Sequence, residues 1–158
     1  MNPAGTGGPA GWVALPPGAA RLDPAGVAAV IERNVWGVLT TVEPAGPYAV
    51  PVIYGWDGAR FHVVSLQGRK AANLDANGAT WFTLVEEDGR GGRRVVMGAT
   101  TAAWTRGLAA RLRSVEVLRR QMKGRRAASA ADAARIAAAR FLTLTPRSLE
   151  GWILPPPS

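Results

Sequence analysis

The residues best suited to chemistry lie in one short step, Ser65-Leu-Gln-Gly-Arg-Lys70, between a β-rich run and a predicted short helix. The first N–H groups of a helix lack partners within it and carry partial positive charge, so they stabilise an anion. Gly68 lets a ligand approach the backbone closely. Arg69 can bind a phosphate through two parallel hydrogen bonds, Lys70 adds a point charge and Ser65 a hydroxyl. The step indicates a phosphate site; the alternative is a solvated Arg-Lys pair on a surface helix.

The sequence contains few of the residues from which other kinds of catalytic site are made. It contains no cysteine, so disulfides, thiolate metal sites and a cysteine nucleophile are excluded. His62 is the only histidine, which argues against a histidine-based metal site or a catalytic triad. We therefore predict no metal site, and the sequence identifies no catalytic residue.

The net charge of +8 raises the question of an anionic partner. Residues 106–126 carry many of the basic side chains on a predicted helix, which would suit nucleic acid or an anionic membrane. The same helix has an apolar stripe, made of Leu108, Leu112, Val115, Leu118 and Met122, that would pack on the rest of the protein. We therefore expect neither nucleic acid nor membrane as a partner.

The sequence around the basic step predicts short strands and a few helices. Asp23-Pro24 begins a predicted helix that runs to about Asn34. Predicted strands follow at residues 36–42, 48–54 and 60–65, with a hairpin turn at Asp57-Gly58. Pro51 inside the second strand indicates an edge, a bulge or an opening in a barrel wall. Along the third strand, Phe61, Val63 and Ser65 should share one face, and His62 and Val64 the other.

The second half continues this pattern. A short helix at 68–76 precedes strands at 80–85 and 95–105, the long basic helix, a helix at 130–139 and a last strand at 141–145. Residues 1–20, rich in Gly, Pro and Ala, form a predicted flexible arm, and residues 21–158 form a single domain. The predicted fold class is mainly β with helices (α+β): a six-stranded antiparallel split β-barrel of Greek-key type with flanking helices.

The order and spacing of these segments resemble the pyridoxamine-phosphate-oxidase-like, FMN-binding split-barrel superfamily, in particular its small nitroimidazole-reductase-type members. The resemblance is carried by the opening helix and by GVLTT, GPYAVPVIY, DGARFHVVS and GRKAANLDANG, and it is clearest over residues 25–105. It implies that Arg69 and Lys70 bind the FMN phosphate and that strand segments line the rest of the cofactor. The implied cofactor-binding residues are Val38, Leu39, Thr40, Thr41, Pro51, Val52, Val64, Ser65, Gly68, Arg69 and Lys70.

The sequence also departs from its relatives at informative positions. Pyridoxamine phosphate oxidases carry Arg near the position of Trp36 and Lys near that of Thr41, which argues against vitamin B6 oxidation. Nitroimidazole-reductase-type members often have His at the position of Val63, whereas here it stands one residue earlier, at His62. A shift of one residue along a strand moves a side chain to the other face, so we predict that His62 is a structural or surface residue and not a catalytic one.

The resemblance implies an FMN-dependent oxidoreductase acting on a small molecule, with the cofactor at a homodimer interface. The alternatives are a deazaflavin cofactor, a haem-binding or flavin-binding carrier or sensor, and a flavin-free enzyme that uses the same cleft. A segment of about 18 apolar residues and a secretory signal pattern are both missing from the sequence, so we expect a cytoplasmic protein.

Overall fold

Eight antiparallel strands form one sheet in the computed structural model, which describes residues 16–44, 46–65, 74, 78–123 and 139–156. Two helices are described, α1 (Pro24–Arg33) and α3 (Leu108–Met122). The strands are β1 (Ala20–Arg21), β2 (Trp36–Glu43), β3 (Gly46–Trp56), β4 (Phe61–Ser65), β5 (Ala79–Glu87), β6 (Arg93–Trp104), β7 (Arg140–Pro146) and β8 (Glu150–Leu154).

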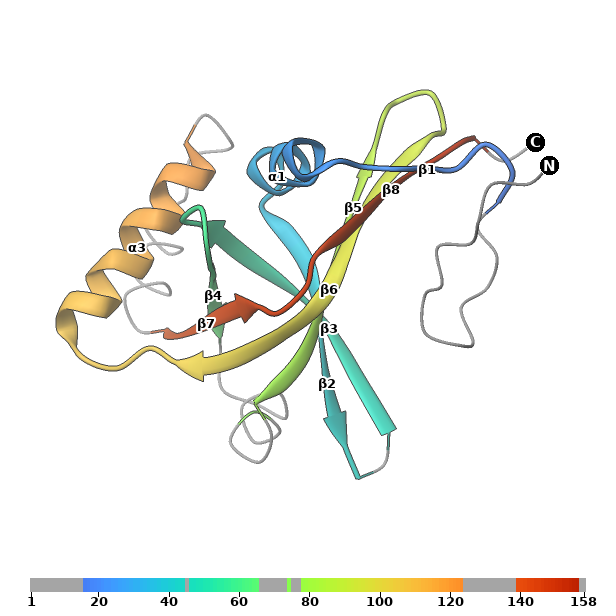
Figure 1. Cartoon of the computed structure of the whole chain (residues 1–158). Coiled ribbons are helices and arrows are strands. Elements are labelled where there is room, and N and C mark those ends of the chain that lie inside the picture. The colour runs from blue at the N-terminus through green and yellow to red at the C-terminus, as the bar shows by residue number, and fades with distance from the viewer. Residues whose placement is uncertain (1–15, 45, 66–73, 75–77, 124–138, 157–158) are drawn as a thin grey trace.

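Six of these strands close into a barrel (Figure 1). The order is β6-β5-β2-β3-β4-β7, and β7 pairs back onto β6. Strands β2, β3 and β4 form a meander, and β5 returns to lie beside β2, which is the Greek-key connection. The predicted fold class is confirmed. The sequence reasoning missed β1 and β8, which extend the sheet beyond β6.

Strand β6 joins the barrel to these two extra strands. Residues from Arg93 to Met97 pair with β8, and residues from Thr100 to Trp104 pair with β7. The link between β7 and β8 crosses over Gly98, where a Cβ atom would overlap the carbonyl oxygen of Ser148. A side chain at this position is therefore incompatible with the crossing.

An aromatic cluster fills the barrel core. The Tyr54 ring packs edge-on against Phe61 and Phe82, with centroids 5.4 Å and 5.5 Å away, and all three side chains are buried. The Tyr54 hydroxyl donates to the carbonyl of Ile31 at 2.7 Å, which satisfies the one polar atom of this cluster. The bond also ties the barrel wall to the end of α1.

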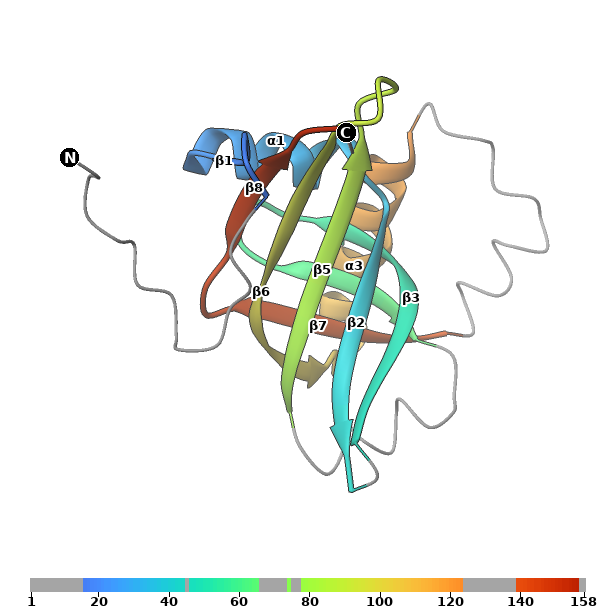
Figure 2. The ribbon, with the colours of Figure 1, turned by 90° about the vertical axis from the view of Figure 1, so that its right-hand side faces the viewer.

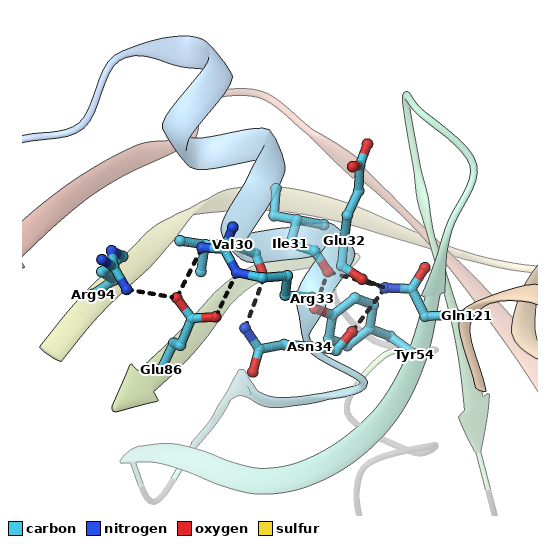
Figure 3. A network of polar contacts seen from close by, with 9 residues as sticks. All are labelled: Val30, Ile31, Glu32, Arg33, Asn34, Tyr54, Glu86, Arg94 and Gln121. Atoms are coloured by element: carbon cyan, nitrogen blue, oxygen red, sulfur yellow. Dashed lines mark hydrogen bonds and ion pairs between the residues drawn. The ribbon is translucent and has the colours of Figure 1, made fainter. Parts of the chain in front are cut away.

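Helix α1 begins as the sequence predicts, because the Asp23 side chain accepts a hydrogen bond from the Gly26 amide at 2.7 Å. Its C-terminal end is held by a second side chain, shown in Figure 3. The Gln121 amide nitrogen lies 3.0 Å, 3.0 Å and 2.7 Å from the carbonyls of Ile31, Glu32 and Asn34. Gln121 thereby connects α3 to carbonyl groups that an α-helix leaves unpaired.

Helix α3 packs on the barrel through a different face from the one predicted. Ser114, Val117 and Leu118 are its buried residues, whereas Leu108 and Leu112 are 74% and 59% exposed. The predicted stripe is therefore wrong except at its C-terminal part. At Leu118 the helix approaches β3 closely, since a Cβ on Gly55 would lie 2.8 Å from the Leu118 backbone nitrogen.

The remaining predicted elements agree in type with the structure, where it describes them. The strands predicted at 48–54, 80–85 and 141–145 extend to Gly46–Trp56, Ala79–Glu87 and Arg140–Pro146. Leu74, inside the predicted helix 68–76, is helical and buried, while the rest of that helix and the one at 130–139 lie outside the described residues. Ala20, assigned to the arm, pairs with β8. In the described part of the chain, neither helix has both the length and the apolar character that crossing a bilayer requires.

Candidate functional site

The barrel opens between β3 and β4. Their ladder joins only Tyr54–Trp56 to Phe61–Val63. Beyond it, within the described parts of the chain, β3 pairs only with β2, while Val64 and Ser65 pair only with β7. Among the described residues, Pro51 stands on a part of β3 that has no β4 neighbour, where the missing N–H of proline is tolerated.

The predicted cofactor-binding residues on β2 and β3 divide between two faces. Val38, Thr40 and Pro51 point outward; Val38 is 39% exposed. Leu39, Thr41 and Val52 are buried on the inner face, because neighbouring residues of a strand alternate between faces. The outward residues can offer side chains to a ligand outside the barrel, and the inward ones only their backbone.

The family resemblance also implies that backbone groups, or the hydroxyl of Thr40 or Thr41, reach the polar edge of the flavin. The Thr41 hydroxyl instead lies 3.4 Å from the Tyr48 carbonyl inside the barrel, and only 1% of the residue is exposed. Thr40 lies on the outer face, opposite Ala49 on one side and Trp81 on the other. Of the two hydroxyls, that of Thr40 is the one placed for a ligand on the outer face.

Apolar side chains make this outer face unusual for a surface. Trp36, Val42 and Val85 are 58%, 60% and 54% exposed, and they flank Val38 on β2 and β5. We call Trp36, Val38, Val42, Pro51 and Val85 the outer patch. Strands β6, β5, β2 and β3 face the viewer in Figure 2, with α3 behind them. Contiguous exposed apolar surface of this kind marks a binding or association site.

The predicted phosphate step begins at Ser65, the last residue of β4. Val64 is half-buried and outward, whereas Ser65 is 2% exposed and lies on the inner face. Ser65 is paired with Arg140, the first residue of β7. Gly68, Arg69 and Lys70 lie outside the described residues, so their part in the site stays a prediction.

His62 lies on a different part of the barrel surface, beneath α3. One ring nitrogen lies 2.9 Å from the Ser114 hydroxyl and the other 3.0 Å from the Asp57 carboxylate. This is the order of groups in a hydrolytic triad, but Ser114 is fully buried and its hydroxyl also reaches the Ala110 carbonyl at 3.2 Å. No substrate can reach such a serine. The contacts support the structural role predicted for His62.

The Asp57 carboxylate is the charged centre of this chain of bonds, and its side chain is only 7% exposed. Burial alone would raise the pKa of this carboxyl, but hydrogen bonds from His62 and from the amides of Ala59 and Arg60 outweigh it. A further bond from Arg113 acts in the same direction. Together they hold the pKa of Asp57 well below its usual range.

Asp57→Asn is expected to lower the free energy of unfolding at pH 7 by about 2–4 kcal/mol, because an amide nitrogen would face His62 or Arg113 in place of an acceptor. A depressed carboxyl pKa stabilises the fold above the unfolded-state value of about 4 and loses that effect below it. The difference between wild type and variant should therefore shrink as the pH falls from 5 to 2. Urea denaturation across this range measures it; a constant difference would contradict the assignment.

A separate groove of about 480 Å³ lies where β1, the start of α1 and β8 meet. Its lining includes Leu22, Val27 and Leu149, with the Arg21–Glu150 ion pair among the polar groups. Of the predicted cofactor-binding residues that the structure describes, none lines it. The groove and the outer patch are therefore two distinct surfaces.

Comparison with known proteins decides the fold. No protein-family model matches the chain, and no curated protein matches it. A solved FAD-binding protein from Mesorhizobium loti superposes with a TM-score of 0.69 at 19% identity, over 85% of this chain and 96% of that one. The fold is that of the pyridoxamine-phosphate-oxidase-like split barrels. Two further structures extend the comparison.

One is a protein from Bacteroides thetaiotaomicron described as a 5-nitroimidazole antibiotic resistance protein, with a TM-score of 0.70 and 13% identity over 85% of this chain and 87% of that one. The other is the haem-storage protein HutZ from Vibrio cholerae, with a TM-score of 0.65 and 15% identity over 82% and 94% of the two chains. At these identities the split barrel is shared while the ligands differ, so the ligand of this chain has to be argued from its own residues.

Proposed function

We propose that this chain binds FMN on the outer patch, beside the opening between β3 and β4, and acts as a flavin-dependent oxidoreductase on a small molecule. The observation that carries the proposal is the position of the exposed apolar residues Val38 and Pro51, opposite each other on β2 and β3. They border the opening beyond which the chain continues from Ser65 into the basic step. The names of two FAD-binding split barrels, from Mesorhizobium loti and Mycobacterium smegmatis, support a flavin as the ligand.

The residues of the site suit the parts of such a cofactor. Val38 and Pro51 offer an apolar surface for the flat ring system, and the Thr40 hydroxyl offers a polar contact at its edge. Arg69 and Lys70 would hold the single phosphate of FMN. A bound flavin supplies the redox chemistry itself, so the protein needs to bind, orient and exclude water, and no side-chain acid or base is required.

A homodimer would complete this site. The outer patch exposes Trp36, Val42 and Val85, which a monomer would leave in water. A symmetric pairing of two such sheet faces would bury these side chains and enclose each flavin between subunits. We therefore include the homodimer in the proposal.

The similarity to HutZ makes haem an alternative ligand. The contacts of the histidine in this chain argue against a histidine-ligated haem. Both ring nitrogens of His62, the only histidine, are engaged by Asp57 and Ser114. A histidine-ligated haem would have to break one of these buried bonds. A deazaflavin shares the apolar ring and the anionic tail of FMN, so the site residues suit it as well, and only a binding measurement separates the two.

Absorbance spectroscopy tests the proposal. Purified protein incubated with FMN and then desalted should keep the two visible and near-ultraviolet bands of an oxidised flavin. The variant Arg69→Ala with Lys70→Ala should bind FMN about 100-fold or more weakly, since two charge-assisted contacts are lost. Arg119→Ala with Arg120→Ala, an exposed basic pair beside Glu116, is the matched control and should bind normally.

Each outcome of this test is decisive for the proposal. A wild-type protein that retains no FMN, retains only a deazaflavin or shows a Soret band with haem would contradict the FMN assignment. A double variant with full FMN occupancy would show that residues 65–70 do not bind the phosphate.

A further inference from the structure

Helix α3 carries apolar residues on the side that does not face the barrel. Leu108 and Leu112 are four residues apart and therefore lie on the same side of the helix. Both are strongly exposed, whereas the buried side of α3 holds Ser114, Val117 and Leu118. The helix lies at one flank of the molecule, on the left in Figure 1. The two leucines therefore point away from the barrel that the rest of α3 packs against.

The leucines belong to a longer exposed segment. Every residue from Arg106 to Arg113 is exposed, and burial in the helix begins only at Ser114. Packing on the barrel therefore does not account for the apolar character of this first part of α3. Water is an unfavourable surrounding for a pair of neighbouring leucine side chains, so a surface that removes both from water would bind here.

The same segment is strongly basic. Residues 106–123 contain one acidic side chain, Glu116, which pairs with both Arg119 and Arg120. Asp57 pairs with Arg113, so these two carboxylates offset only part of the positive charge. The basic residues of the segment are all exposed; they are Arg106, Arg111, Arg113, Arg119, Arg120 and Lys123. The charge of this surface favours an anionic partner.

The leucines indicate which anionic partner fits. Cationic side chains alone would suit either nucleic acid or anionic lipid. Leucine gains nothing from a phosphate backbone, but it can enter the acyl region of a bilayer while long arginine side chains reach the headgroups. The expectation against a membrane partner assumed that Leu108 and Leu112 pack on the protein, and their exposure removes that reason.

We propose that the exposed face of α3 docks on the surface of a membrane that contains anionic lipids. Leu108 and Leu112 enter the bilayer, and the basic side chains around them contact the lipid headgroups. Helix α3 lies behind the strands that carry the outer patch (Figure 2), so docking leaves that patch accessible. The inference does not depend on a flavin being bound, and it adds a partner to the proposed function.

Co-sedimentation with lipid vesicles tests the docking. Wild-type protein should bind vesicles made of equal parts phosphatidylglycerol and phosphatidylcholine, and rising salt should weaken this binding. Vesicles of phosphatidylcholine alone should bind about 10-fold or more weakly, because they lack the anionic headgroups.

Leu108→Asp is the variant that separates docking from general charge attraction. It should weaken binding to the anionic vesicles about 10-fold or more, since an inserted leucine is replaced by a carboxylate. The helix should tolerate the change, because an acidic side chain in the first turn is favourable. Ile153→Asp, which makes the same charge change at an exposed position on β8, is the matched control and should bind nearly as wild type does.

A fluorescent label reports which residues enter the bilayer. The chain contains no cysteine, so Leu112→Cys provides a single attachment point for a polarity-sensitive dye. The emission of this dye should shift to the blue when the anionic vesicles are added. A dye attached through Ile153→Cys should show no shift.

Several results would overturn the inference. One is the absence of binding to anionic vesicles, and another is binding that Leu108→Asp leaves at the wild-type level, because net charge alone would then explain it. Binding to a DNA duplex without binding to vesicles would assign the basic surface to nucleic acid instead. Should Leu108→Asp not fold, an unshifted emission from the dye at residue 112 would overturn the inference by itself.

Discussion

Alanine in place of Gly98 is expected to lower the free energy of unfolding by about 3 kcal/mol or more, which for a domain of this size corresponds to about 10 °C in Tm. The added methyl group would overlap the carbonyl oxygen of Ser148, and the obstacle is backbone that cannot rotate away. The link that carries this carbonyl is itself fixed, since the Arg147 amide donates to the Ala99 carbonyl at 2.8 Å. Relief would require β7 or β8 to move away from β6.

Thermal and urea denaturation of Gly98→Ala against wild type measures this effect. Thr101→Ala, at an exposed position on the same strand, is the control and should change the free energy of unfolding by well under 1 kcal/mol. Wild-type stability in the Gly98→Ala protein would mean that the link between β7 and β8 does not cross β6 at this residue.

Aspartate in place of Val38 should weaken FMN binding at least about 100-fold. A carboxylate at this position would be buried without a partner against the flavin ring and the second subunit, which costs several kcal/mol. The folded monomer should tolerate the change, because Val38 is 39% exposed and points away from the core. Fluorescence titration with FMN measures the affinity, and sedimentation measures whether the dimer is lost with it.

Ile153→Asp provides the matched control for this experiment. Ile153 is 40% exposed, so the same charge enters a strand at nearly equal exposure. It stands on β8, three strands from β2 and therefore about 14 Å away across the sheet. Equal loss of FMN binding in both variants would indicate general destabilisation, and unchanged binding in Val38→Asp would place the flavin elsewhere.

The fold could be predicted well because its signals are local. The Asp23 cap, the Asp57-Gly58 turn and the apolar runs of the strands each act within a few residues, and the family resemblance fixed their order. The two-stranded extension was missed because β1 has only two residues and β8 is bounded by Leu149 and Pro155, so neither carries a strong strand pattern.

The sequence also did not predict which face of β2 and which face of α3 is buried. Val38 and Leu39 are both apolar, so the alternation along β2 does not say which of them enters the core. On α3 the hydrophobic pattern favoured Leu108 and Leu112, but the barrel buries Ser114 because His62 bonds to its hydroxyl. A polar residue that is buried by a single distant partner leaves no periodic signal.

The site residues were predicted only in part. The resemblance selected Val38 to Thr41 as a continuous run, and the structure assigns only Val38 and Thr40 to the outer face. The pairing of Ser65 with Arg140 was not predicted, because it joins two strands across 75 residues of sequence. Such contacts depend on how the barrel closes, which no local pattern encodes.

Hydrogen–deuterium exchange with and without saturating FMN tests the central claim most directly, because it reports where the cofactor sits. The account predicts slower exchange in peptides covering residues 46–53, the part of β3 without a β4 neighbour, and residues 64–70. Exchange around the separate groove, at residues 20–27 and 149–154, should stay the same. Protection confined to that groove, or no protection of residues 46–53 and 64–70, would contradict a flavin site on the outer patch.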